Sequence, residues 1–82
     1  MTLHAELLAE VQMLAHFNLG NSQEGLKVHH DASPELVAAT RRLHAKGLIS
    51  QADGGYLTHL GLEAAEHAQS LLSILEQKEE AA

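Results

Sequence analysis

Cysteine is absent from the 82-residue sequence, which excludes disulfide bonds, thiolate metal sites and cysteine nucleophiles. Aromatic residues are nearly absent too, because Phe17 and Tyr56 are the only two, so the core must be aliphatic. Two aromatic side chains cannot build a stacking platform for unpaired bases. This argues against single-stranded nucleic acid as a ligand.

Long apolar runs and positive charges are also scarce. Without a long apolar run, the sequence predicts neither a membrane span nor a signal peptide, and a cytoplasmic protein is expected. Five lysines and arginines stand against eleven acidic residues, which gives a formal net charge of −6. Four of the five cations fall between Ser22 and Ser50. Such asymmetry is typical of a local anion-binding face on an acidic protein, although solvated surface charges would give the same pattern.

The first part of the sequence indicates two helices. Thr2 can cap the first helix, and Gly20 has the conformational freedom needed after its end. The expected apolar stripe of this helix comprises Leu3, Leu7, Leu8, Val11, Leu14 and Ala15. A short second helix is expected from about Gln23 to His30, although Gly25 and the alternation that follows it would also suit a strand.

The next pattern predicts a helix over residues 34–46. Ser33 is a good N-cap, Pro34 suits the first helical position because its missing N–H is not needed there, and Gly47 ends the helix. The face expected to enter the core comprises Leu36, Ala39, Thr40 and Leu43. The opposite face comprises Glu35, Ala38, Arg41, Arg42 and Ala45.

A hairpin and a last helix complete the predicted domain. Leu48 to Ala52 predicts a strand, Asp53-Gly54 a two-residue turn, and Gly55 to Thr58 the return strand. Thr58 then caps a helix whose apolar stripe is expected to comprise Leu60, Ala64, Ala65, Ala68, Leu71, Leu72 and Leu75. A single domain is expected over residues 1–76, followed by a polar tail over residues 77–82 that frays.

Two stretches carry a family resemblance. They are Ser22 through Ser33 to Ile49, which includes Arg42-Leu43-His44-Ala45-Lys46-Gly47-Leu48-Ile49, and Leu57-Thr58-His59-Leu60-Gly61. Together they resemble the winged helix-turn-helix of bacterial regulators of the MarR and ArsR type. The whole chain also resembles a small family of uncharacterised bacterial proteins. The expected fold is mainly α with a small β-hairpin: a winged helix-turn-helix with three to four helices and a two-stranded wing.

The resemblance implies a double-stranded DNA-binding protein, expected to be a transcriptional regulator, with helix 34–46 in the major groove. Carried over by position, the candidate DNA-binding residues are Lys27, Ala38, Arg41, Arg42 and Lys46. Arginine suits guanine edges and phosphates because its planar donors bind bidentately, whereas the lysines would contact phosphate. The pattern departs from the family at Asp53, in a wing without cations, at Glu35 and at His30. The alternative is a protein-interaction module that keeps the fold without DNA contacts.

The sequence predicts no catalytic or metal site. His59, Glu63 and His67 share one helix face, but the two histidines lie about 12 Å apart along the axis, too far for one ion. Adjacent His29 and His30 would point to different sides of a helix. Glycine-rich phosphate loops, a nucleophile elbow and a His-Glu-x-x-His motif are missing, so neither enzymatic activity nor a cofactor is expected.

The terminal helices carry more apolar residues than one short domain would cover. Leu8 lies beside the main stripe of the first helix, and Leu62 and Ile74 lie outside that of the last. Burying an exposed leucine or isoleucine contributes roughly 1.5–3 kcal/mol. A homodimer through the terminal helices is therefore expected, with scattered surface apolar residues as the alternative.

Overall fold

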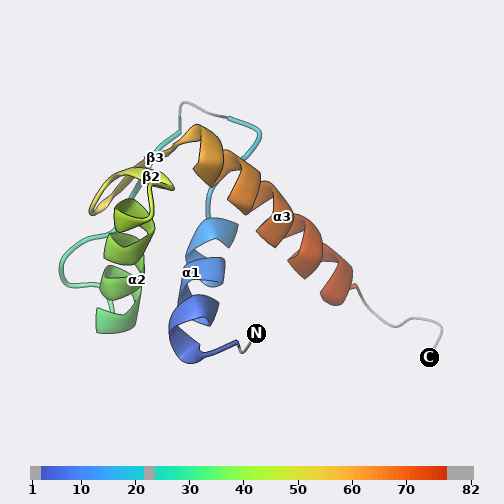
Figure 1. The fold of residues 1–82 in the computed structure, drawn as a ribbon, viewed down its shortest axis with the longest axis horizontal. Coiled ribbons are helices and arrows are strands. Elements are labelled where there is room, and N and C mark those ends of the chain that lie inside the picture. The colour runs from blue at the N-terminus through green and yellow to red at the C-terminus, as the bar shows by residue number, and fades with distance from the viewer. Residues whose placement is uncertain (1–2, 22–23, 78–82) are drawn as a thin grey trace.

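Three helices and a small antiparallel sheet make up the described residues, 3–21 and 24–77, of the computed structural model (Figure 1). The elements follow in the order α1 (Ala5–Ala15), β1 (Leu26–Lys27), α2 (Pro34–Ala45), β2 (Ile49–Gln51), β3 (Gly54–Leu57) and α3 (His59–Leu75). The sheet has the strand order β1-β3-β2. Helix α1 lies between α2 and α3 and contacts both, so it is the centre of the fold (Figure 1).

The predictions for α2 and for the start of α3 are confirmed. Ser33 Oγ accepts a hydrogen bond from the N–H of Leu36 at 3.3 Å, and Pro34 opens the helix. The helix ends at Ala45, one residue earlier than predicted, and Gly47 follows with a φ of +80°. Thr58 caps α3, because its Oγ1 accepts from the N–H of Gly61 at 3.0 Å.

The predicted second helix is wrong where the structure describes it. Residues 24–30 hold the short strand β1, which pairs antiparallel with β3 at Leu26–Gly55 and Lys27–Gly54. Gly54 allows this pairing, since a Cβ there would lie 2.0 Å from the carbonyl oxygen of Leu26. The sheet is therefore three-stranded rather than two-stranded. Gln23, the expected start of the helix, lies outside the described residues.

The hairpin forms as predicted but its turn is shifted by one residue. Ala52 and Asp53 make the turn, and Gly54 is already the first residue of β3. The φ of +131° at Gly54 belongs to the region that favours glycine. The N–H of Val28 donates to the carbonyl oxygen of Asp53 at 2.8 Å, so the chain beyond β1 fixes the turn from outside the hairpin.

Helix α1 differs from its prediction in extent and in orientation. His4 caps it, Thr2 lies outside the described residues, and Gly20 has no positive φ. The buried side chains of α1 and the turn after it are Glu10, Met13, Leu14 and Phe17, whereas the predicted stripe members Leu3 and Leu8 are exposed. The helix is therefore turned so that the carboxylate of Glu10 enters the domain, whereas Leu8 does not.

Small residues bring α3 close to the rest of the domain. Ala65 is fully buried, and a Cβ at Gly61 would lie 1.8 Å from the carbonyl oxygen of Leu48. Part of the predicted stripe is wrong, because Leu60, Leu71 and Leu75 are exposed. The residues that form the core cluster are Met13, Leu14, Phe17, Val28, Leu43, Ile49 and Ala65. No helix among the described residues has the length and hydropathy that crossing a bilayer requires.

Candidate nucleic-acid interface

Adjacent arginines of α2 belong to different surfaces of the molecule. Successive residues of an α-helix point roughly 100° apart, so Arg41 and Arg42 leave α2 in different directions. Arg42 turns toward α1, whereas Arg41 points to solvent on the side away from the buried residue Leu43. The sequence analysis placed both arginines on one exposed face, and the structure separates them.

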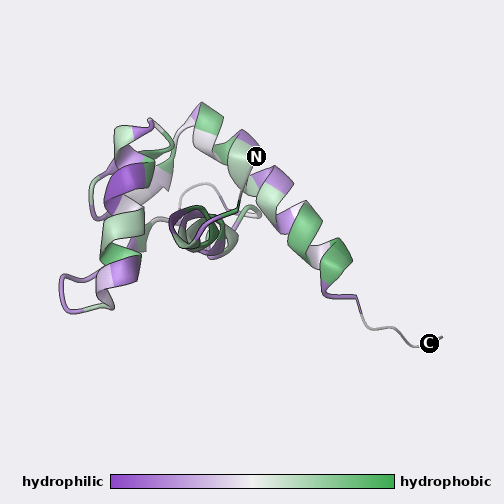
Figure 2. Cartoon of the chain, turned by 60° about the horizontal axis from the view of Figure 1, so that its bottom comes forward, coloured by the Kyte–Doolittle hydropathy of each residue, from purple (hydrophilic) through white to green (hydrophobic). Residues whose placement is uncertain are grey.

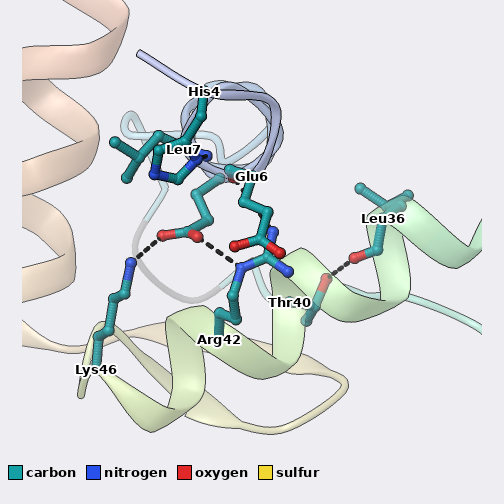
Figure 3. A network of polar contacts seen from close by, with 8 residues as sticks. His4, Glu6, Leu7, Leu36, Thr40, Arg42 and Lys46 are labelled. Atoms are coloured by element: carbon teal, nitrogen blue, oxygen red, sulfur yellow. Dashed lines mark hydrogen bonds and ion pairs between the residues drawn. The ribbon is translucent and has the colours of Figure 1, made fainter. Parts of the chain in front are cut away.

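Arg42 and Lys46 both contact the carboxylate of Glu10 on α1 (Figure 3). Arg42 Nε donates to Glu10 Oε2 at 2.7 Å, and Lys46 Nζ donates to Glu10 Oε1. Arg42 Nη2 also donates to the carbonyl oxygen of Glu6 at 3.2 Å. Glu10 is only 5% exposed, so both cations serve to hold a buried carboxylate between α1 and α2.

The two cations keep Glu10 ionised. Burial alone raises the pKa of the Glu10 carboxyl, because it disfavours the charged form. The hydrogen bonds and positive charges of Lys46 and Arg42 outweigh this effect, and the pKa of Glu10 lies below its ordinary value of 4.5. An ionised carboxylate therefore stands at the α1–α2 contact at neutral pH. It neutralises charge that the sequence analysis had assigned to DNA.

Lys27 is held more loosely. Its Nζ lies 3.8 Å from Asp53 Oδ2, and both side chains are at least half exposed. Exposed ion pairs of this kind contribute little, because water solvates both partners and salt screens them. Lys27 is therefore available to an anionic ligand that can compete with one carboxylate.

Arg41 is exposed and forms no ion pair with any residue in the described part of the chain. It borders a hollow of about 350 Å³ between α2, the segment after β1 and the β2–β3 turn. The basic groups around this hollow are Lys27, His29, His30 and Arg41, and Asp53 is its one carboxylate. We call these four side chains the basic rim.

Ala38 lies next to the basic rim rather than within it. It is half-buried and borders a second, more open depression that also touches His30, Arg41 and Arg42. Of the five predicted residues, the structure thus gathers Lys27 and Arg41 at the hollow. Ala38 lies beside the hollow, and Arg42 and Lys46 lie at the α1–α2 contact.

Sequence reasoning missed His29, His30 and Glu10. From the sequence, the two histidines are considered as metal ligands on a helix, and His30 also as a departure from the family pattern. The strand β1 instead carries the chain so that both border the hollow. Their nearness to Lys27 in the sequence was a usable signal. Glu10 lies between Leu7 and Leu14 at helical spacing, and an acidic residue within an apolar stripe indicates a buried carboxylate with cationic partners.

Histidine clusters do not add a metal centre among residues 3–21 and 24–77. No three histidine, aspartate or glutamate side chains there are placed so that they could hold a metal ion. His59, Glu63 and His67 are all exposed along α3.

Comparisons with known proteins give a family and no activity. No curated protein and no solved structure matches the chain. A family model described as DUF5669, a family of unknown function, matches residues 1–76, which is most of the sequence. The chain therefore belongs to the DUF5669 family.

Proposed function

We propose that this chain binds double-stranded DNA as a winged-helix domain, with the exposed side of α2 in the major groove. The observation that carries the proposal is the basic rim around the hollow between α2 and the β2–β3 turn. Two further features support it. Helix α2 leads directly into a hairpin and then a long helix, and the sheet order β1-β3-β2 places the hairpin beside the end of β1.

The position of the basic rim suits a backbone phosphate. A helix seated in the major groove lies beside the phosphates that border the groove, and a turn next to that helix reaches over the same backbone. Arg41 offers paired donors to phosphate oxygens or to a guanine edge. Lys27 adds a point charge, and the imidazoles of His29 and His30 can donate hydrogen bonds in their neutral form.

The α1–α2 contact limits how strong this binding is. Arg42 and Lys46 are engaged by Glu10, so few cations remain for phosphates, and the whole chain carries a net charge of −6. We therefore expect weak affinity at low salt that falls as salt rises. The slope of log K against log salt should be about −0.9 for each phosphate neutralised, and about −2 in total for Lys27 and Arg41.

The test is fluorescence anisotropy of a short labelled duplex of mixed sequence, titrated with the protein at several salt concentrations. Arg41→Ala should weaken binding by about tenfold or more without lowering the melting temperature. His44→Ala is the matched control, because His44 is exposed on α2 but does not border the hollow. Asp53→Asn should tighten binding a few-fold, since it removes the carboxylate that competes for Lys27. Unchanged binding by Arg41→Ala would refute the proposal.

A protein-interaction module is the second candidate, and a specific observation favours it. Helix α3 exposes Leu60, Leu71, Ile74 and Leu75, which is unusual for a helix of a small monomer. If no duplex binds at low salt, this apolar surface becomes the functional face of the chain. The two candidates use different helices, so both can be tested in the same protein.

A further inference from the structure

Helix α3 carries two adjacent rows of mostly apolar residues. The domain covers one of them, and in the second row it packs against Ala64 but leaves the large apolar side chains exposed. The covered row comprises Gly61, Ala65, Ala68 and Leu72, whose members are buried or half-buried. The second row comprises Leu60, Ala64, His67, Leu71 and Ile74, and we call it the open row. Its three large apolar side chains, Leu60, Leu71 and Ile74, are 53%, 54% and 62% exposed. The apolar side of α3 thus extends beyond the surface that the domain covers.

The end of α3 also extends past the rest of the molecule. In Figure 1 the helix leads away from α1 toward the C-terminus, and Figure 2 shows apolar residues along its last turns. Leu75, which lies beside the open row, is 67% exposed. None of the described elements lies over this end of the helix in either view.

We propose that a second copy of this chain covers the open row through antiparallel pairing of two α3 helices centred on His67. Successive members of the row are alternately four and three residues apart, which is the spacing that keeps a seam facing a partner helix. The row is also self-complementary. Reversal about His67 places Leu60 opposite Ile74 of the second copy and brings Ala64 within one residue of the level of Leu71, so large side chains meet apolar or small ones.

The residues beside the open row keep carboxylates apart in an antiparallel pair. Glu63 and Ser70 border the row on its solvent side. In an antiparallel pair each Glu63 lies near Ser70 of the other copy, so the two Glu63 carboxylates do not face each other. The basic rim lies on other elements, so the pairing does not depend on DNA binding.

The first experiment measures the oligomeric state of the full chain by sedimentation velocity over a range of protein concentrations. The unchanged chain should dimerise, and Leu71→Glu should raise the dissociation constant by about tenfold or more. Ser73→Glu introduces the same charge at an exposed position outside the open row and should leave the dimer unchanged. Circular dichroism checks that both variants are folded. A monomeric unchanged chain, or a dimer that Leu71→Glu leaves intact, would overturn the proposal.

The second experiment uses the absence of cysteine to determine the direction of pairing. Because the chain has no other thiol, a single introduced cysteine can form a disulfide only with the same cysteine of the second copy. Under mild oxidation, His67→Cys should give a covalent dimer rapidly, whereas Leu60→Cys alone should not. The double variant Leu60→Cys, Ile74→Cys should again cross-link, because these positions meet across an antiparallel pair. Ser73→Cys is the off-row control. Cross-linking of Leu60→Cys as fast as His67→Cys would refute the antiparallel arrangement.

Discussion

Helix α1 is held on its two sides by different chemistry. Toward α2 the contact is ionic, with the buried Glu10 carboxylate between Arg42 and Lys46. Toward α3 the contact is neutral. Gln69 Nε2 donates to the carbonyl oxygens of Phe17, Leu14 and Ala15 at 2.7, 3.2 and 3.4 Å, beside the fully buried Ala65.

Both contacts satisfy polar groups that burial would otherwise leave without a partner. The last carbonyl groups of α1 lack the amide partner four residues on that the body of a helix provides, and the amide of Gln69 donates to those of Leu14 and Ala15. The Leu14 oxygen also accepts from the N–H of Phe17 at 3.4 Å. Glu10 needs positive charge, which the last turn of α2 supplies. One side of α1 is therefore sensitive to charge and pH, whereas the other is sensitive to shape.

The largest expected effect comes from shape, where α3 closely approaches the backbone of Leu48. Gly61→Ala should destabilise the fold by about 3 kcal/mol, because the new Cβ would collide with the backbone at Leu48. Urea unfolding measures the change. Gly20→Ala is the control, since its Cβ would meet only the side chain of Asn18 at 3.3 Å, and it should stay within about 0.5 kcal/mol. Equal stability of the two variants would show that α3 is not tightly seated.

Breaking the ionic side should cost somewhat less. Arg42→Ala should lower the free energy of unfolding by about 2 kcal/mol, because it removes one of two cations from a buried carboxylate. The cost is below that of a fully buried pair because Lys46 remains and is half exposed. Arg41→Ala removes the neighbouring arginine and should change stability by less than about 0.5 kcal/mol. Similar losses for both variants would contradict the division between the two arginines.

Removing the amide on the neutral side should have a smaller effect. Gln69→Leu leaves the carbonyl oxygens at the end of α1 without their donor and should cost about 1 kcal/mol in urea unfolding. Gln12→Leu, at an exposed position on α1, is the control and should be nearly neutral. A neutral result for Gln69→Leu would mean that water replaces the amide without loss.

The smallest effect is a pH dependence confined to the ionic side. The folded-state pKa of Glu10 lies below its unfolded value, so its stabilising contribution is present above pH 4.5. That contribution is lost as the pH falls through the lowered folded-state pKa. Urea unfolding between neutral pH and about pH 3 should therefore show a loss that Glu10→Gln reduces. Gln69→Leu should keep the pH dependence of the unchanged chain, and a flatter profile for that variant would argue against the distinction.

Local signals were sufficient to predict α2, the hairpin and the start of α3. Ser33 with Pro34, Gly47 and Thr58 each act within a few residues of their own position, and the structure places all of them as predicted. The strand β1 could not be obtained this way. Its two residues are fixed by pairing with β3, which lies far along the sequence. The local sequence around them suits a helix about as well as a strand.

The candidate site was predictable in part for the same reason. The clustering of cations in the sequence is enough to indicate Arg41 and Lys27 as site residues. The role of Arg42 depends instead on which side of α2 meets α1. The sequence analysis also assumed that the largest apolar residues of the last helix face the core. In the structure the small residues Gly61 and Ala65 face the core at close approach, and the larger Leu60 and Leu71 are exposed.

Thr58 has a consequence for any assembly of this chain. Its Oγ1 donates to the carbonyl oxygen of Gly47 at 2.6 Å while accepting from Gly61, and its N–H donates to the carbonyl oxygen of Leu48 at 3.0 Å. The first turn of α3 is thereby tied to the residues that end α2. A dimer built on α3 would therefore hold its two α2 helices at a set separation, and duplexes would be selected by the distance between half-sites as well as by charge.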